Sequence, residues 1–321
     1  MEQQLEIVIP TYNRVENLNN TLNQIFNSNI SDKLFVTVID NCSPIEIKSL
    51  LLPKALGNPN FRILINKTNI GICGNILRCF EHCRSKWLWV LGDDDDIDFK
   101  VLEEVLPKLT GDYYNFSSEM YSRKIDIRGQ GINDFIRNLD SYSNCLYISS
   151  NFYRVDAFLT SLSSGYMNTA SLAPQIAILL GGLNNDLKFC LSNKVLIRDR
   201  DNSKPSWSII EQSLNFSSIL FINPLLKNNL TKSFFKKMTK NELPPIKIFL
   251  SFLLYIQKNQ IEYSASNLLL KKIFSERYMF SNMFTKFKGL FFRLIFKIFG
   301  LRILTFINYI NMSHKLKNIR S

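Results

Sequence analysis

The chain has 321 residues, of which 46% are hydrophobic and 21% are charged. This composition excludes a disordered protein and supplies enough apolar side chains for a sizeable core. The net charge is +12, but residues 271–321 alone carry eleven Lys or Arg and one acid, which leaves only +2 for the first 270 residues. A nucleic-acid-binding protein usually spreads its charge over the folded surface, so this distribution argues against a nucleic-acid partner.

The cysteines and the amino-terminal residues indicate the compartment. Six cysteines lie on or beside apolar segments without forming a CxxC pair: Cys42, Cys73, Cys79, Cys83, Cys145 and Cys190. No set of Cys and His has the spacing of a zinc site, so we expect reduced, packed thiols. The first residues lead directly into an apolar strand without the features of a secretory signal, which favours a cytoplasmic location.

Strands alternate with helices over the first 120 residues. Apolar runs predict strands over residues 5–10, 34–40, 61–65 and 87–91, and helical spacing predicts helices over residues 15–28, 45–56, 72–83 and 99–109. Strands this apolar, each followed by a helix, predict a mostly parallel sheet that is buried on both faces. In such sheets ligands bind beyond the carboxyl ends of the strands.

The pattern changes twice further along the chain. After residue 112 it is mixed, with short strands expected over residues 113–116 and 195–197 and a helix over residues 173–180. Beyond Pro224, and clearly after Pro244 and Pro245, the chain becomes helical and rich in Phe, Ile, Leu and Lys. We therefore expect an α/β domain over residues 1–222, divided near residue 120, and an α-helical region over residues 223–321.

Four adjacent carboxylates, Asp93–Asp96, follow the apolar run 87–91 and Gly92. Adjacent carboxylates repel one another, so the cluster needs a physical reason. At the carboxyl end of a parallel strand this reason is usually a divalent cation, Mg²⁺ or Mn²⁺, shared between one or two carboxylates and substrate phosphates. The alternative is a solvated acidic turn that happens to follow a strand.

Four motifs occur in one order: Ile9–Arg14 (IPTYNR), Val38–Ser43 (VIDNCS), Asn69–Gly71 with Asn75, and Leu91–Asp95 (LGDDD). Together they resemble the family 2 glycosyltransferases, which are inverting nucleotide-sugar enzymes of the GT-A fold. The resemblance covers residues 4–120 well and residues 120–220 loosely. It implies a nucleotide-sugar-binding half over residues 1–120, an acceptor half over residues 121–222, and a helical appendage.

The resemblance also implies roles for single residues. The residues expected to contact the donor are Pro10, Thr11, Asn13, Arg14, Asp40, Asn69, Gly71, Asn75 and Asp93. The loop after the first strand would cradle the base and diphosphate, Asp40 would hydrogen-bond the base, and the helix start at Gly71 would favour anions. The structural alternatives are a polar turn, a capping residue and a simple turn glycine.

The acidic motif of the family is usually written Asp-x-Asp, and here Gly92 falls on its first position. Asp94 then becomes the best metal ligand, and Asp94 and Asp95 are the expected metal-binding and catalytic pair. Asp93 or Asp95 would face the ribose or a metal-bound water, and a register slip of one residue would exchange these assignments. The cation would neutralise the phosphates of the leaving nucleotide.

An inverting transfer also needs a carboxylate that accepts the proton of the acceptor hydroxyl. The family commonly supplies it at the start of a helix, here expected near residues 171–178, where this sequence has no acid. The remaining carboxylates of the region do not match the pattern: Asp156, Asp186, Asp199, Asp201 and Glu211. The general base is therefore unidentified, and a catalytically silent GT-A-like scaffold that binds membrane or a partner transferase is the alternative function.

Residues 284–315 form a predicted helix with a narrow basic stripe and a broad apolar side. The stripe consists of Lys286, Arg293, Lys297, Asn308, Asn311 and Lys315. The opposite side consists of Phe291, Ile295, Ile298, Phe299, Leu304 and Phe306. This pattern suits a helix in the interface of an anionic membrane, whereas the alternative is packing against the catalytic domain or a second subunit.

Taken with this tail, the resemblance implies a bacterial enzyme held peripherally on the inner face of the cytoplasmic membrane. It would transfer a sugar from a nucleoside-diphosphate sugar to a lipid-linked or polysaccharide acceptor in O-antigen, lipopolysaccharide or capsule synthesis.

Overall fold

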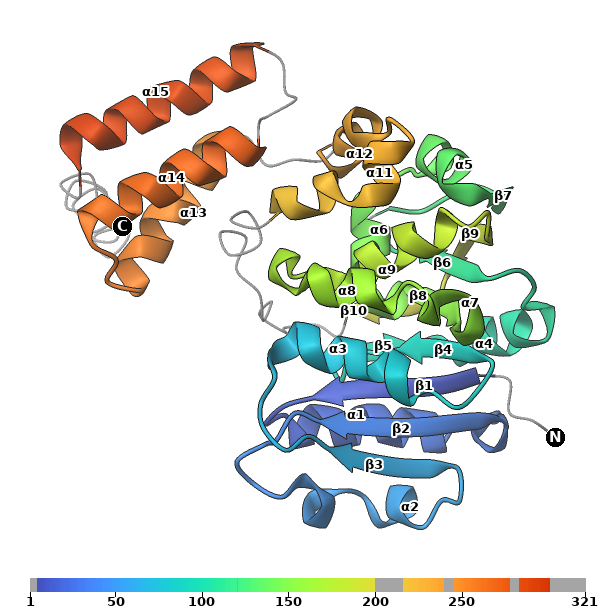
Figure 1. The fold of residues 1–321 in the computed structure, drawn as a ribbon. Coiled ribbons are helices and arrows are strands. Elements are labelled where there is room, and N and C mark those ends of the chain that lie inside the picture. Colours follow the sequence, from blue (N-terminus) through green and yellow to red (C-terminus); the bar gives the residue numbers. More distant parts are fainter. Residues whose placement is uncertain (1–4, 120, 200–215, 240–244, 278–282, 301–321) are drawn as a thin grey trace, which may run out of the picture. The chain divides into compact units, whose positions relative to one another are not determined.

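The computed structural model describes residues 5–119, 121–199, 216–239, 245–277 and 283–300. A central sheet organises the amino-terminal part of the chain (Figure 1). The described strands of this sheet have the order β3-β2-β1-β4-β8-β6-β9-β7. Their bounds are β1 Leu5–Thr11, β2 Leu34–Asp40, β3 Phe61–Ile65, β4 Trp87–Val90, β6 Tyr113–Ser117, β7 Ile127–Gln130, β8 Asn151–Arg154 and β9 Lys188–Val195. A separate two-stranded sheet pairs β5 (Asp95–Ile97) with β10 (Ile197–Asp199).

The half of the sheet built by β3, β2, β1 and β4 is entirely parallel. β1 and β2 pair in register from Leu5 with Leu34 to Thr11 with Asp40, so these two strands end side by side. The other half is mixed, because β8 runs antiparallel to both β4 and β6, whereas β6 and β9 are parallel. The α/β architecture with a mostly parallel sheet is therefore confirmed.

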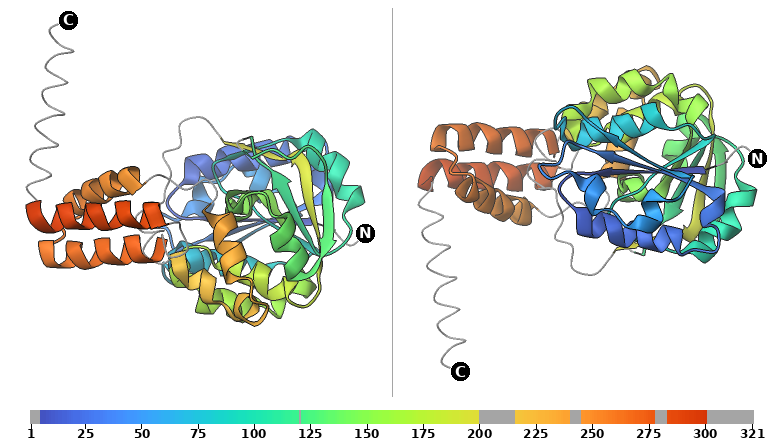
Figure 2. Two further views of the ribbon diagram at one scale, coloured as in Figure 1. Left: turned by 90° about the horizontal axis from the view of Figure 1, so that it is seen from above. Right: turned by 90° about the horizontal axis from the view of Figure 1, so that it is seen from below.

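Helices cover both faces of this sheet, and α1 and α3 lie on opposite faces (Figure 2). The helices of this part are α1 Val15–Phe26, α2 Pro53–Leu56, α3 Gly71–His82, α4 Phe99–Val105, α5 Gly131–Asn138, α6 Tyr142–Leu146, α7 Val155–Leu159, α8 Leu162–Met167, α9 Pro174–Leu183, α11 Asn223–Lys227 and α12 Thr231–Met238. Short 3-10 helices are η1 Ser31–Lys33, η2 Ile47–Leu50, η3 Leu106–Lys108, η4 Ile148–Ser150, η5 Thr169–Ser171 and η6 Phe216–Phe221. The apolar side chains of α1 (Leu18, Leu22, Ile25) are buried in the core.

Two predicted helices are shorter in the structure than in the sequence analysis. The segment 45–56 divides into η2 and α2 because Pro53 begins a new helix at its first position, where a missing N–H is tolerated. The segment 99–109 ends its α-helix at Val105 and continues as η3, which contains Pro107. Proline interrupts helical hydrogen bonding in both cases.

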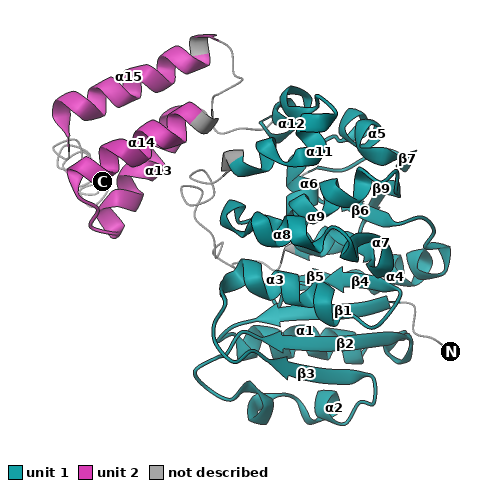
Figure 3. Ribbon diagram, viewed as in Figure 1, with its two compact units in different colours: residues 1–204, 218–240 teal, residues 205–217, 241–321 magenta. Residues whose placement is uncertain are grey.

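The chain divides into two compact units, residues 1–204 with 218–240 and residues 205–217 with 241–321 (Figure 3). Helices α11 and α12 therefore belong to the first unit, although they lie beyond residue 222. There Phe234 of α12 packs edge-on against Tyr142 of α6, with ring centroids 5.8 Å apart. The boundaries at residues 120 and 222 stay predictions about functional halves.

The second unit is helical, with α13 Pro245–Lys258, α14 Tyr263–Arg277 and α15 Met283–Phe299. Its core is aromatic: Phe296 is fully buried and contacts Phe252 and Tyr263 at ring-centroid distances of 5.7 and 5.6 Å. Gly289 permits the close approach of α15 to α14, because a Cβ at this position would lie 2.8 Å from the ring of Phe274. No helix in the described ranges is long and apolar enough to cross a membrane.

Candidate active site

Residues that follow β1, β2 and β4 meet at one edge of the sheet. The amide of Asn41, just after β2, donates a hydrogen bond to the carbonyl of Thr11 at the end of β1, with a distance of 2.9 Å. On the other side of β1, the amide of Leu91 donates to the carbonyl of Val8. The parallel register therefore brings the motifs after residues 10, 40 and 91 to the same place.

Arg14 connects the loop after β1 to the acidic cluster after β4. Its guanidinium pairs with Asp93 through Nη1 at 2.8 Å and with Asp94 through Nη2 at 2.6 Å. The Thr11 hydroxyl donates a further hydrogen bond to Asp93, at 2.8 Å. The left-handed φ of 54° at Asn13, which asparagine tolerates well, turns the chain between β1 and α1 at this point. The positive charge of Arg14 is thus shared by the carboxylates of Asp93 and Asp94.

Asp93 is almost completely buried, and burial raises its pKa to about 6. The guanidinium of Arg14 and the hydroxyl of Thr11 oppose this rise, whereas the neighbouring carboxylates Asp94 and Asp95 add to it. Loss of water stabilisation for the charged form is the largest influence. Asp93 therefore takes up a proton at a higher pH than an exposed aspartate does.

Asp95 and Asp96 have other partners. The hydroxyls of Tyr147 and Ser149, from the predicted acceptor half, each donate a hydrogen bond of 2.5 Å to one oxygen of Asp95. Gln24 on α1 donates to Asp96 at 2.8 Å. Asp93 and Asp94 therefore share Arg14, whereas Asp95 and Asp96 have neighbours of their own, and these contacts lower the mutual repulsion of the four carboxylates.

Gly92 provides the space in which this acidic turn folds. A Cβ at this position would lie 2.7 Å from Oδ2 of Asp95 and 3.1 Å from Oδ1 of Asp94. The first acid of the family motif is thus replaced by the residue that lets the next carboxylates fold back against the main chain. The amide of Gly92 donates to the Ser149 hydroxyl at 2.9 Å, which joins the turn to the acceptor half.

Asp40 is buried and holds the loop after β2. Its carboxylate accepts hydrogen bonds from the Ser43 amide, at 3.2 Å to each oxygen, and from the Ser43 hydroxyl, at 2.6 Å. The Ser43 hydroxyl oxygen in turn accepts a hydrogen bond of 2.8 Å from the amide of Asn13. This arrangement matches the capping alternative and also fixes the carboxylate beside the loop of Arg14.

Four asparagines, Asn41, Asn66, Asn69 and Asn75, form a continuous network beside Asp40, which we call the asparagine network. Asn66 donates to Asn41 at 3.0 Å and to Asn75 at 2.9 Å, and Asn41 donates to Asn69 at 2.8 Å. Asn69 accepts a bond of 2.9 Å from the amide of Gly71, which has a positive φ of 74° at the start of α3. The predicted turn at Asn69 and Gly71 is thus tied to the end of β2.

An open pocket of about 670 Å³ lies beside this turn, between the start of α3 and η5. Its walls are formed by Ile70, Gly71, Ile72, Cys73, Gly74, Tyr166, Thr169, Ala170 and Leu172. The hydroxyl of Tyr166 donates to Glu81 at 2.6 Å. Burial raises the pKa of the Cys73 thiol to about 11, so this thiol is not a nucleophile near neutral pH.

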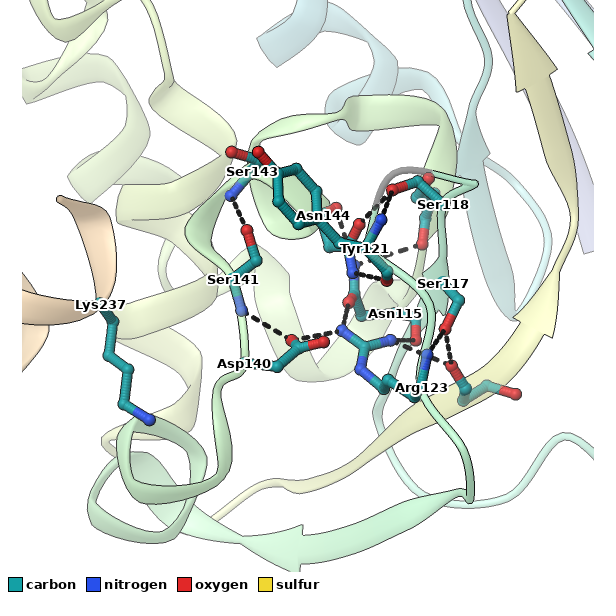
Figure 4. Close-up of polar contacts among 12 residues, drawn as sticks. Asn115, Ser117, Ser118, Tyr121, Arg123, Asp140, Ser141, Ser143, Asn144 and Lys237 are labelled. Atoms are coloured by element: carbon teal, nitrogen blue, oxygen red, sulfur yellow. Dashed lines mark hydrogen bonds and ion pairs between the residues drawn. The ribbon is translucent and has the colours of Figure 1, made fainter. Parts of the chain in front are cut away.

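The buried guanidinium of Arg123 joins several polar groups of the predicted acceptor half to the end of β6 (Figure 4). Arg123 pairs with Asp140 at 3.0 Å and donates to the carbonyl oxygens of Asn115 and Ser192, each at 3.0 Å. Asn144 donates to the carbonyl of Tyr121 at 2.8 Å and so joins the same group. These contacts fix the segment after β6, which ends at the same edge of the sheet as β4.

The start of α9 lacks an acid, as the sequence analysis found. Pro174 begins this helix, and the carboxamide of the buried Gln175 follows, donating to the carbonyl of Leu146 at 3.1 Å. Its Oε1 has no hydrogen-bond partner among the described residues. A neutral amide thus occupies the first turn, where the resemblance would place the general base.

The other carboxylates considered as base are scattered. Asp156 is exposed and pairs with Arg154 at 2.9 Å, and Asp186 follows α9 with a positive φ of 58°. The backbone of Asp199 lies opposite Asp95 where β10 pairs with β5. Asp201 and Glu211 lie outside the described residues.

The oxygen atoms of the acidic cluster differ in whether they could bind the predicted cation. Among the residues that the structure describes, no group of three His, Cys, Asp or Glu side chains has the arrangement of a metal site. Asp94 is partly exposed, and its Oδ1 receives no hydrogen bond from described residues, whereas both oxygens of the buried Asp95 accept one. The chemistry fits a hard cation held by Asp94 together with phosphate and water oxygens.

Residues 6–163 match the family model described as Glycosyl transferase family 2. The chain carries a family 2 glycosyltransferase domain. It is accordingly an enzyme of the glycosyltransferase class. A comparison with curated protein sequences finds no match.

Solved glycosyltransferase structures have the same fold. TarS 1–349 from S. aureus in complex with UDP-GlcNAc is 13% identical, with a TM-score of 0.54 over 90% of this chain and 89% of that chain. The mannosyltransferase PcManGT from Pyrobaculum calidifontis, in complex with GDP-Man and Mn²⁺, is 11% identical, with a TM-score of 0.55 over 93% and 88%. At these identities the likeness supports the GT-A-like fold of this glycosyltransferase.

Several polar residues at this edge were not singled out by sequence reasoning. Asn66 and Ser43 hold the turns after β3 and β2, and Tyr147 and Ser149 reach Asp95 from the acceptor half. For Asn66 the signal was its place directly after the predicted strand 61–65. Tyr147 and Ser149 gave no local signal, because they lie more than fifty residues from Asp95 in the sequence.

Proposed function

We propose that this glycosyltransferase performs a metal-dependent, inverting transfer of a sugar from a nucleoside-diphosphate sugar. The observation that carries the proposal is the cluster in which Arg14, Thr11, Asp93 and Asp94 come together at the carboxyl edge of the sheet. Both neighbours in complexes with nucleotide sugars, UDP-GlcNAc and GDP-Man, support this donor class. The complex that contains Mn²⁺ supports the cation.

The nucleoside and the diphosphate of the donor would contact different groups of residues. Asp40 and the asparagine network offer oriented hydrogen-bonding groups for the nucleoside. Arg14 and the helix start at Gly71 offer positive potential for the diphosphate. A cation held by Asp94, with Asp95 beside it, would neutralise charge that develops on the leaving phosphate.

We assign the acceptor to the lipid-linked or polysaccharide intermediates of O-antigen, lipopolysaccharide or capsule synthesis. The support is the basic carboxyl-terminal region, which carries +10 over residues 271–321. Such a charge attracts an anionic membrane surface, at roughly 1 kcal/mol for each basic side chain close to it. The enzyme would act in the cytoplasm, held peripherally on the inner face of the membrane, where a lipid-linked acceptor and soluble donor are both within reach.

A catalytically silent scaffold that binds membrane or a partner transferase is the second candidate. The specific observation in its favour is Gln175, the amide in the first turn of α9, in a place where the family commonly has an acid. A scaffold would bind membrane without turning over donor.

The test has two stages. A thermal-shift screen of nucleotide sugars with and without Mn²⁺ identifies the donor, because selective binding stabilises the native state. With that donor, Asp94→Ala is expected to lower turnover about a hundredfold or more, since it removes an electrostatic contact to the reacting diphosphate. Nucleotide release measures this change.

The matched control is Asp156→Ala, which removes an exposed carboxylate of the same unit and is expected to leave turnover unchanged. Turnover that persists in excess chelator, or after Asp94→Ala, would contradict the metal assignment. Donor binding without any turnover in the unaltered protein would favour the scaffold.

A further inference from the structure

Helix α15 has two apolar faces. One face packs inside the helical unit: Phe292 stacks on Phe249 with ring centroids 5.1 Å apart, Phe296 is fully buried, and Gly289 lies against Phe274. These three residues follow one another at spacings of three and four, so they share a single side of the helix. This side of α15 therefore packs against α13 and α14.

The second face points away from the packed one. It consists of Phe287, Leu290, Phe291, Leu294 and Ile298, which we call the outer face of α15. These side chains are between 50% and 65% exposed. Their spacing of three, one, three and four residues places them together on the side opposite Phe296. A continuous row of large apolar side chains on a protein surface is uncommon without a partner.

Basic side chains flank the outer face. Lys286, Arg293 and Lys297 fall within about 40° of one another at the helical repeat, between the outer face and the packed face. Lys288 lies on the other flank, and the described residues of α15 include no acid. A helix that presents apolar side chains in the middle and cations on both edges has the charge pattern that complements an anionic lipid surface.

We propose that the outer face of α15 docks into an anionic lipid bilayer, with α15 lying parallel to the membrane plane. This inference deepens the proposed peripheral location and rests on it, by naming the docking surface. The apolar side chains would enter the boundary between headgroups and acyl chains, and the flanking cations would stay at headgroup level because their long aliphatic stems allow it. Phe292 and Phe296 would remain inside the helical unit.

The structure changes the division expected from the sequence alone. Phe291 and Ile298 belong to the outer face as expected, and Phe299 is exposed as well. Leu290, Leu294 and Phe287 join them, although the sequence analysis did not single them out. Leu304, Phe306, Asn308, Asn311 and Lys315 lie outside the described residues, so the docking surface is argued from α15 only.

Binding to lipid vesicles tests the proposal with the full-length protein. Sedimentation with vesicles of phosphatidylglycerol and phosphatidylcholine in equal parts should retain the protein, whereas phosphatidylcholine alone should retain much less. Binding should weaken as salt is raised, because salt screens the attraction between exposed charges. Equal binding to both vesicle types, or no binding, would overturn the proposal.

Two pairs of variants separate the outer face from general properties of the chain. Phe291→Glu with Leu294→Glu should lower vesicle partition about tenfold or more, because it removes apolar burial and adds two anions. Ile125→Glu with Leu226→Glu introduces the same charges at exposed apolar positions of the other unit and should have a much smaller effect. Similar losses in both variants would overturn the assignment of the surface.

The contribution of the flanking basic side chains to vesicle binding is tested in the same way. Lys286→Glu with Lys297→Glu should weaken binding to anionic vesicles, whereas Lys232→Glu with Lys236→Glu on α12 changes net charge equally and should weaken it less. Leu294→Trp provides a measurement that does not depend on whether the other variants fold. The emission of the added tryptophan should shift to shorter wavelength when the protein binds anionic vesicles. An unshifted emission would contradict insertion.

One further outcome would identify a different occupant of the outer face. Vesicle binding that is insensitive to all outer-face variants, together with a dimer that dissociates in Phe291→Glu with Leu294→Glu, would assign the face to a second copy of the chain. Thermal shifts with nucleotide sugars, measured in the same preparations, report the proposed transferase function separately. Failure of donor binding with intact vesicle binding would refute that function and leave the docking surface standing.

Discussion

Gly92 shows how one residue shapes the acidic turn. The resemblance places an acid at this position, yet a Cβ here would lie 2.7 Å from Asp95 and 3.1 Å from Asp94. The absence of a side chain allows both carboxylates to fold back toward the strand from which they emerge. The conformation of the turn therefore depends on the absence of a side chain at Gly92.

Gly92→Ala is accordingly expected to disturb the turn more than the fold. Pushing Asp94 and Asp95 outward by part of an ångström should lower donor turnover about tenfold to a hundredfold, since small misplacements near reacting groups are costly. Steady-state turnover and thermal unfolding measure the two effects. Gly57→Ala is the control, because its added Cβ would meet only one carbonyl oxygen, at 3.4 Å. Equal activity of the two variants would show that the turn tolerates a side chain.

At the scale of single elements, the local sequence explains the parallel half of the sheet well. β2 and β3 have the predicted bounds. β2 is rich in β-branched residues and almost entirely buried, whereas β3 is an apolar edge strand that is only partly buried. β5 and β8 were not predicted. β5 begins with Asp95 and Asp96, and it exists because β10 pairs with it from a hundred residues away, a contact that no local pattern contains.

The candidate site divides in the same way. Thr11 and Asp40 end apolar strands and Asp93 comes shortly after another, so the sequence could place them at the carboxyl edge, while their roles stay predictions. The hydroxyls of Tyr147 and Ser149 reach Asp95 only through the tertiary fold. The asparagine network is intermediate, because Asn41 and Asn66 directly follow strands, whereas the contacts that join them to Asn69 and Asn75 are non-local.

Arg123 is expected to be the most sensitive charged residue among the elements of the acceptor half. Arg123→Met leaves Asp140 and two carbonyl oxygens without their donor, which should lower the free energy of unfolding by about 3 kcal/mol. Urea denaturation measures this loss. Arg137→Met removes an exposed pair with Asp134 and should change it by less than about 0.5 kcal/mol. A difference within error between the two would contradict a structural role for the Arg123 contacts.

At the scale of the whole molecule, the two units have buried clusters without a shared member. One lies along the sheet and includes Trp87 and Trp89, and the other joins α13, α14 and α15 around Phe296. Separate cores usually unfold with separate stabilities, so a single unfolding temperature would describe this protein poorly.

Phe296→Ala should therefore affect one unfolding transition. Removing this ring is expected to cost about 3–5 kcal/mol in the helical unit, because the cavity closes only partly. Scanning calorimetry should show a lowered transition for that unit, while the donor-dependent stabilisation of the other transition persists. Phe299→Ala, at an exposed position of the same helix, should leave both transitions in place. A uniform shift of all unfolding after Phe296→Ala would show that the units unfold together.

The asparagine network has a consequence for how donor recognition responds to acidity. Amide side chains neither take up nor release protons over the range in which proteins fold, so the turns that they hold keep the same charge at every such pH. The opposite end of the site contains Asp93, whose pKa burial raises to about 6, beside Asp94 and Arg14. Donor affinity should therefore depend on pH through Asp93 at the diphosphate end, whereas the four amides of the network add no pH dependence of their own, and a pH titration of donor affinity measures this.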